Sequence, residues 1–270
     1  MTDFQTLLNE RGVLIADGAT GTNYFALGLE TGYPPELWNI EHPARVKGLH
    51  RQFLDAGSDL ILTNSFGGTS FRLKLHNVQD RVHELNMAAA RLAREAADEH
   101  ASETGRTVLV AGSMGPTGEL FAPLGPLDHA GAVAGFGDQA EALAEGGVDL
   151  LWIETISSLE EVNAALEAAR KTGLKVAATM TFDTAGKSMM GVDPADYARH
   201  VASAGAVALG GNCGVGPAEL MHSILAMQGE MDAAHDTPLI AKGNCGIPEY
   251  RDGAIHYHGS PELMAEYAVL

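Results

Sequence analysis

The chain of 270 residues is 46% hydrophobic and carries a formal net charge of −18, which argues against nucleic acid and anionic membrane surfaces as partners. Its two cysteines make no disulfide framework, and the sequence shows neither a signal-peptide pattern nor an apolar stretch of about 20 residues, so we expect a cytoplasmic protein. No low-complexity segment or linker interrupts the chain, and we expect a single domain over residues 1–270.

Short apolar runs alternate with amphipathic stretches along the chain. The runs are rich in Val, Ile, Leu and Ala without strict alternation, as expected of parallel strands buried on both faces. They predict seven strands, at 13–16, 60–63, 108–112, 150–154, 176–181, 207–211 and 239–242. Apolar residues recur at helical spacing between them, and this predicts helices at 80–100, 160–171 and 194–204.

The alternation of strands and helices predicts an α/β fold built from right-handed βαβ units with a parallel sheet. Polar, glycine-containing segments after nearly every strand favour a (β/α)₈ TIM barrel over an open sheet. After the seventh strand we expect a loop over 244–260 and a helix over 261–270, with Ser260 as N-cap and Pro261 at its first position. No closing strand follows, so we expect the eighth strand and the C-terminal tail to be missing from these 270 residues.

The ends of the predicted strands carry most of the chemistry-bearing side chains. In a barrel of this kind, these ends and the loops after them form the active face. In chain order they are Asp17-Gly18, Asn64-Ser65-Phe66, Ser113-Met114-Gly115, Glu154-Thr155, Thr181-Phe182-Asp183, Asn212-Cys213 and Asn244-Cys245. Carboxylates bind an ammonium group and backbone N–H groups bind a carboxylate, so this set suits a small zwitterion such as an amino acid.

Each of these residues also has a structural interpretation. Asp17 precedes a glycine and is equally compatible with capping a turn. Glu154 follows a strongly apolar run, where a carboxylate is costly unless it is paired or exposed, and this favours a function. The cysteines are also compatible with small buried hydrophobes. No compact ligand spacing supports a four-ligand zinc site made of Cys213, Cys245, His256 and His258.

Five motifs, taken together, resemble the homocysteine S-methyltransferase family, which includes betaine–homocysteine methyltransferases and the homocysteine module of cobalamin-dependent methionine synthase. They occur in the family's order over nearly the whole chain. The motifs are Asp17-Gly18-Ala19-Thr20-Gly21-Thr22, Thr63-Asn64-Ser65-Phe66-Gly67, Ala111-Gly112-Ser113-Met114-Gly115-Pro116, Ile153-Glu154-Thr155 and Gly211-Asn212-Cys213-Gly214.

The resemblance implies a zinc-bearing barrel that methylates homocysteine to methionine. Cys213 matches the family's first zinc thiolate and is the expected catalytic residue. The other two thiolates belong to a Gly-Gly-Cys-Cys pair after the eighth strand, expected beyond Leu270. Asn244 matches an asparagine that is an oxygen ligand in some relatives, which makes it a weaker metal candidate, and Cys245 is a variant beside it.

The same resemblance assigns the substrate and leaves the methyl donor open. The amino-acid end of homocysteine is assigned to four residues, Asp17, Gly18, Ser65 and Glu154, and Phe66 is a further candidate for substrate binding. Betaine, or a similar small methyl-onium donor, would need an aromatic cage, for which Trp38, Phe66, Trp152 and Phe182 are available. The stretch at 35–39 is instead closer to the methionine-synthase branch, and Gly67 stands where betaine-using relatives tend to carry an aromatic residue. A stand-alone module of that branch would take its methyl group from a separate methylcobalamin protein.

Two other functions are compatible with the sequence. One is a non-catalytic barrel that binds a small amino acid or a corrinoid protein, because the chain lacks two expected thiolates. The other is an unrelated barrel enzyme, such as a lyase that uses Glu154 and Asp17 for acid–base chemistry. A homo-oligomer is compatible with the sequence, which does not fix the oligomeric state.

Overall fold

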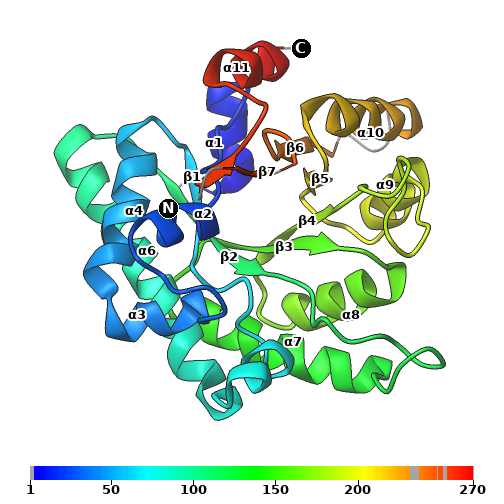
Figure 1. Ribbon diagram of the computed structural model, residues 1–270, viewed down its shortest axis with the longest axis horizontal. Helices are drawn as coiled ribbons and strands as arrows, with labels where there is room; N and C mark the ends of the chain where they lie inside the picture. The colour runs from blue at the N-terminus through cyan, green and yellow to red at the C-terminus, as the bar shows by residue number, and fades with distance from the viewer. Residues whose placement is uncertain (1–2, 232–236, 248, 252–253, 270) are drawn as a thin grey trace. The chain divides into compact units, whose positions relative to one another are not determined.

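The computed structural model describes residues 3–231, 237–247, 249–251 and 254–269 (Figure 1). The chain divides into two compact units. Unit 1 consists of Met1–Ile153 and Asn163–Val176, and unit 2 consists of Glu154–Val162 and Ala177–Leu270. The single domain expected over 1–270 stays a prediction.

Six parallel strands form the main sheet, and their order in the sheet is their order in the chain. They are β1 (Leu60–Leu62), β2 (Leu109–Met114), β3 (Leu150–Ile156), β4 (Lys175–Met180), β5 (Ala208–Cys213) and β6 (Leu239–Gly243). In unit 1, β2 pairs with β1 and with the first residues of β3, and in unit 2, β5 pairs with β4 and β6. Strands β1 and β2 are buried throughout, as their unbroken apolar runs predict. The predicted α/β class is confirmed.

Helices lie between these strands. Those of unit 1 are α1 (Phe4–Arg11), α2 (Gly21–Ala26), η1 (Pro35–Leu37), α3 (Trp38–Glu41), α4 (Pro43–Asp55), α5 (Ser70–Leu73), η2 (Lys74–His76), η3 (Gln79–Arg81), α6 (Val82–Thr104), α7 (His129–Glu145) and most of α8 (Leu159–Arg170). Those of unit 2 are α9 (Pro194–Ser203), α10 (Pro217–Glu230) and α11 (Pro261–Val269). The helices predicted at 80–100, 160–171 and 194–204 are confirmed as α6, α8 and α9.

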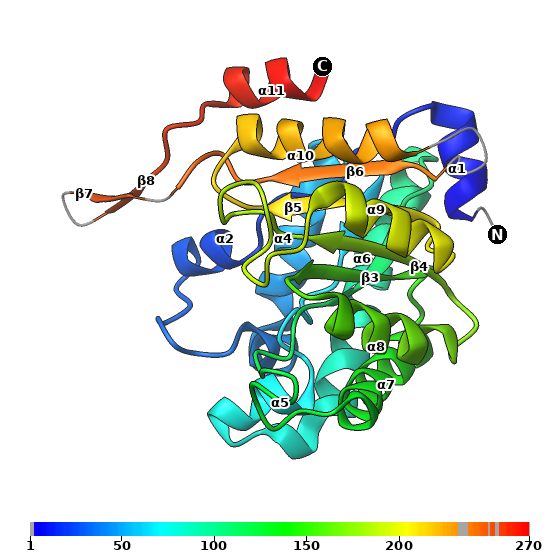
Figure 2. The ribbon, with the colours of Figure 1, turned by 90° about the vertical axis from the view of Figure 1, so that its right-hand side faces the viewer.

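Within each unit the long helices pack in pairs. In unit 1, α6 packs on both α4 and α7. In unit 2, α10 packs on α9 and lies along β6, as Figure 2 shows. None of the helices in the described part of the chain is long and apolar enough to cross a membrane.

Two helix-to-strand connections of unit 1 repeat one sequence pattern, Gly-x-Asp-Leu. Gly57 and Gly147 have φ values of +108° and +95°, a conformation that glycine adopts without steric cost after a helix. The aspartate two residues later, Asp59 or Asp149, precedes β1 or β3. Its carboxylate accepts a backbone N–H from a neighbouring segment, so the same four residues both turn the chain and join it to the sheet.

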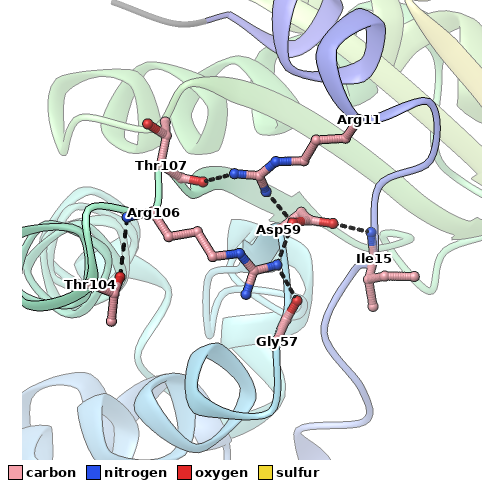
Figure 3. Close-up of polar contacts among 7 residues, drawn as sticks. All are labelled: Arg11, Ile15, Gly57, Asp59, Thr104, Arg106 and Thr107. Carbon is pink, nitrogen blue, oxygen red and sulfur yellow. Dashed lines mark hydrogen bonds and ion pairs between the residues drawn. The ribbon is translucent and has the colours of Figure 1, made fainter.

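Asp59 is the centre of a buried polar cluster at the start of β1 (Figure 3). Its carboxylate accepts the Ile15 N–H at 2.8 Å and forms ion pairs with Arg11 and Arg106, the latter at 2.5 Å. Arg106 also donates to the Gly57 carbonyl at 2.5 Å. Two cations and a backbone donor surround the carboxylate, and their interactions with it offset the free energy cost of removing it from water.

The strand predicted at 13–16 is wrong. Only Ala16 bridges to Leu60, as an isolated parallel pair, and the segment does not continue as a strand. The side chains of Val13 and Ile15 are 69% and 54% exposed, so these apolar residues gain little burial from extending the pairing. The backbone of Ile15 is held instead by Asp59 and Leu60.

The segment after β6 also differs from the prediction. In place of a loop over 244–260, the chain forms an antiparallel hairpin of β7 (Glu249–Arg251) and β8 (Ala254–His256), which stands away from α10 in Figure 2. The dipeptide Asp252-Gly253, a frequent hairpin signal in sequences, was available to predict it. The helix after the hairpin is confirmed as α11, and the Leu263 N–H donates to its predicted N-cap, Ser260, at 3.2 Å. Leu270 lies outside the described residues.

Replacing Asp59 with alanine should lower the free energy of unfolding by about 3 kcal/mol, because Arg11, Arg106 and the Ile15 N–H all lose their shared acceptor. Urea denaturation followed by circular dichroism measures this. The control is Asp98→Ala, which removes an exposed partner of Arg94 and should change stability by less than about 1 kcal/mol. Equal losses in the two variants would contradict the prediction.

Candidate functional site

Unit 2 brings four polar residues together at the carboxyl ends of β3 and β5: Glu154, Thr155, Asn212 and Cys213. Asn212 is the centre of the group and is buried. Its Oδ1 accepts the Thr155 N–H at 2.9 Å, and its Nδ2 donates to Thr155 Oγ1 at 2.7 Å. Nδ2 also lies 3.4 Å from Glu154 Oε2 and 3.4 Å from Cys213 Sγ. One amide therefore contacts a carboxylate, a hydroxyl and a thiol.

The backbone at this point has an uncommon conformation in two residues. Thr155 and Cys213 have φ values of 61° and 59°, in the left-handed region that non-glycine residues rarely adopt. For the β-branched Thr155 the conformation is a true outlier. Its backbone N–H donates to Asn212 Oδ1 and its hydroxyl accepts from Asn212 Nδ2, and these two hydrogen bonds offset the cost. Such strain clusters at functional sites, which supports a functional interpretation of this group.

The thiol of Cys213 is protonated near neutral pH in the metal-free chain. Burial raises its pKa, and the nearby charge of Glu154 acts in the same direction. Hydrogen bonds from Thr155, whose Oγ1 lies 3.7 Å from Sγ, and from Asn212 oppose this shift, as does the charge of Lys242. A thiol in this state is a weak nucleophile and becomes a good ligand only when a metal displaces its proton.

Asn244, the second metal candidate, follows β6 and contacts the turn that carries the thiol. Its N–H donates to the Cys213 carbonyl at 3.2 Å, and its Nδ2 donates to the Gly214 carbonyl at 3.0 Å. Cys245, its neighbour, is half-buried. Over the residues that the structure describes, no group of three or more His, Cys, Asp or Glu side chains could hold a metal ion. The described residues alone therefore do not fit a four-coordinate zinc ion.

Unit 1 holds the other predicted substrate residues at the carboxyl end of β1. Asp17 is buried, and its Oδ2 accepts the Leu62 N–H at 2.8 Å. A Cβ added to Gly18 would lie 3.0 Å from the ring of Phe53, so the backbone there passes close to α4. Ser65 is buried and donates to the Ser113 carbonyl at 2.8 Å, while the ring of Phe66 is 38% exposed. Ser65 is thus placed by protein contacts, and Phe66 is accessible.

Sequence reasoning missed a set of buried polar side chains around the loop after β1. They come from four separate elements and are Glu36, Asn39, Asn86 and Gln139. For Glu36 a signal existed, because it lies between prolines and large apolar residues, and a carboxylate in such a stretch is costly unless it has a partner. Asn86 and Gln139 lie inside long helices and gave no signal.

A family model described as homocysteine S-methyltransferase matches residues 14–269 of this chain. The chain belongs to the homocysteine S-methyltransferase family. The family resemblance inferred from the five motifs is thereby confirmed, although the roles of individual residues stay predictions. The match covers both units, including the Glu154–Cys213 group and the loop after β1.

Similar proteins include two mycobacterial methionine synthases. That of Mycobacterium tuberculosis (strain ATCC 25618 / H37Rv) is 29% identical over 98% of this chain and 23% of its own length. That of Mycobacterium leprae (strain TN) is 27% identical over 98% of this chain and 22% of its own length. The chain therefore spans under a quarter of the length of these curated relatives.

Among solved structures, the homocysteine methyltransferase MmuM from Escherichia coli is similar. Its metallated form aligns with a TM-score of 0.77 at 24% identity, over 90% of this chain and 87% of that one. Its oxidized form aligns with a TM-score of 0.78 at 24% identity, over 90% of this chain and 86% of that one. At this identity the likeness shows a shared fold.

The raised pKa of Cys213 predicts slow alkylation. The chain has two cysteines, so Cys245→Ser leaves Cys213 as its single thiol. In the metal-free variant, we expect the rate of iodoacetamide alkylation to rise with an apparent pKa above the value of about 8.5 for a free cysteine, because the thiolate is the nucleophile and burial disfavours it. Mass spectrometry across pH 6 to 10 measures this rate.

The matched variant for this titration is Thr155→Val, which keeps the shape of the side chain and removes its hydroxyl. Since that hydrogen bond lowers the pKa of Cys213, the titration should move to still higher pH. An inflection below that of free cysteine, or a shift to lower pH in the valine variant, would contradict the description of the thiol.

Proposed function

We propose that this chain binds homocysteine and supports transfer of a methyl group to its thiol, giving methionine. The observation that carries the proposal is the Glu154–Thr155–Asn212–Cys213 group, in a chain that belongs to this family. It combines a carboxylate that suits a substrate ammonium with a thiol that suits a metal, and both are fixed by one buried amide.

The reaction forms a bond between the homocysteine sulfur and the methyl carbon, while the bond between that carbon and its donor breaks. The homocysteine thiol must first lose its proton, because at a pKa of about 8.5 it is mostly protonated at pH 7. In our proposal Glu154 binds the ammonium group in unit 2. Asp17, Gly18 and Ser65 are proposed for the amino-acid end on the family resemblance alone, and Phe66 is proposed as a further substrate contact.

We extend the proposal to a zinc ion with Cys213 as one ligand and Asn244 as a weaker candidate. A bound zinc ion lowers the pKa of a coordinated thiol and so supplies the thiolate. The described residues do not complete such a site, and the family resemblance assigns the remaining thiolates to a cysteine pair beyond Leu270. MmuM, with which the chain shares its fold, has been solved in a metallated form, and this supports a metal. The six parallel strands in chain order support the proposal of a (β/α)₈ barrel.

For the methyl donor, the packing of the aromatic residues favours a methylcobalamin protein over betaine. Of the four candidates for a betaine cage, Trp38, Trp152 and Phe182 are buried. The Trp38 ring packs edge-on against Tyr24, with ring centroids 5.6 Å apart, and beneath the guanidinium of Arg45. Only Phe66 of the four has an accessible ring, which falls short of a cage around a quaternary ammonium. The relatives named methionine synthase support methionine as the product.

Cys213→Ser tests this function in the full-length protein. We expect formation of methionine from homocysteine and methylcobalamin to fall by at least roughly 100-fold, together with loss of one bound zinc per chain, because the serine hydroxyl does not replace a zinc thiolate. Cys245→Ser is the matched control and should keep activity within about twofold.

Three outcomes would contradict parts of the proposal. Methionine formed from betaine alone would exclude the methylcobalamin donor. A full-length protein without zinc would exclude the metal. Homocysteine binding without methyl transfer from any of the donors tested would support the non-catalytic alternative.

A further inference from the structure

The loop after β1, residues 64–68, is held by the short segment 35–39. Asn64 and Asn39 bond reciprocally: Asn39 Nδ2 donates to the Asn64 carbonyl at 2.9 Å, and Asn64 Nδ2 donates to Asn39 Oδ1 at 3.0 Å. Asn64 Nδ2 also donates to the Pro35 carbonyl at 2.7 Å. At the other end of the loop, the Gly67 N–H donates to Glu36 Oε1 at 2.6 Å. One five-residue segment therefore fixes both ends of the loop.

The opposite side of the loop is fixed by two helices. Gln139 of α7 donates to the Ser65 carbonyl at 2.7 Å and to Asn86 Oδ1 at 3.1 Å. Asn86 of α6 donates to the Gly68 carbonyl at 2.8 Å. Both side chains are fully buried. On this side, each contact reaches the loop backbone or joins the two supporting side chains, so Asn86 and Gln139 hold the loop through its main chain.

The two glycines of the loop are required by this arrangement. A Cβ added to Gly67 would lie 2.9 Å from Glu36 Oε1, and one added to Gly68 would lie 2.2 Å from Asn86 Oδ1. Glu36 and Asn86 approach the loop backbone this closely because Gly67 and Gly68 have no Cβ. The loop backbone that follows Ser65 and Phe66 is therefore in close contact with its supporting side chains.

Glu36 is the unusual member of this set, because it is an acid. It is 5% exposed, and burial raises the pKa of its carboxyl group. The backbone N–H of Gly67 and the more distant charges of Arg72 and His76 favour the carboxylate and oppose that shift. An apolar side chain would fill this space without the desolvation cost, so packing does not account for a carboxyl group here.

We propose that Glu36 is a positioning residue for homocysteine binding, which acts by holding the Gly67 backbone and thereby the loop that carries Ser65 and Phe66. The inference rests on the proposed function and deepens it, since it names a residue of the 35–39 segment that the family motifs leave without a role. Glu36 itself does not contact the substrate. Its effect passes through the Gly67 N–H.

The test compares three variants of the full-length, zinc-loaded protein by calorimetric titration with L-homocysteine. Glu36→Ala removes the acceptor and should weaken binding about tenfold, as expected for loss of one strong hydrogen bond. Glu36→Gln keeps an oxygen that accepts the Gly67 N–H and should bind within about twofold of the original protein. Asp59→Ala destabilises the same strand from its other end and should leave the affinity unchanged.

Hydrogen exchange of the peptide covering the loop gives a second readout that does not depend on homocysteine. Glu36→Ala should speed exchange there, and Glu36→Gln should not. Unchanged exchange in Glu36→Ala, or equal losses of affinity in Glu36→Ala and Asp59→Ala, would overturn the positioning role. Failure of the original protein to bind homocysteine would instead overturn the proposed function, while the exchange result still decides whether Glu36 holds the loop.

Discussion

The side-chain amide of Asn212 is the interaction on which the candidate site depends. Strands β3 and β5 are separated by β4 in the sheet, and yet Asn212 at the end of β5 bonds both the backbone and the hydroxyl of Thr155 at the end of β3. An amide offers a donor and an acceptor at once, which neither a carboxylate nor a hydroxyl pair reproduces with the same geometry. Without it, Thr155 would lose the two hydrogen bonds that offset the cost of its left-handed backbone.

The surroundings of Cys213 explain why its thiol is protonated although it lies beside groups that stabilise a thiolate. Burial and the charge of Glu154 keep Cys213 protonated, while the hydroxyl and amide beside it are oriented to stabilise the thiolate once it forms. In the proposed function, a bound cation would shift the balance between these two opposing influences toward the thiolate. A metal ligand needs this property, since an already ionised buried thiolate would be costly in its absence.

Much of the fold was predictable because parallel strands buried on both faces correspond to unbroken apolar runs in the sequence. The apolar runs located β1 to β6, and the helical spacing located α6, α8 and α9. The apolar run at 13–16 has the same composition, but the strand predicted there does not form. Composition does not indicate whether a segment packs against other apolar residues, and Val13 and Ile15 are exposed. The pairs of residues that contact each other in the site were harder still to predict from the sequence. Thr155 and Asn212 are 57 positions apart in sequence, and their contact depends on the register of three strands.

Asn212 and Glu36 hold candidate site residues in two different ways, one through side chains and one through the backbone. The two ways differ in how far a sequence motif can identify them. Asn212 acts through side chains, and its motif with Cys213 identified it as polar at a strand end. Glu36 acts on the backbone at Gly67, so its partner carries no side chain that a motif could record. The glycine there is usually explained by a turn, but the close approach of a carboxylate oxygen is the stronger constraint. A Cβ at position 67 would lie 2.9 Å from Glu36 Oε1, so the identity of residue 67 bears on the support of the loop as well as on the methyl donor.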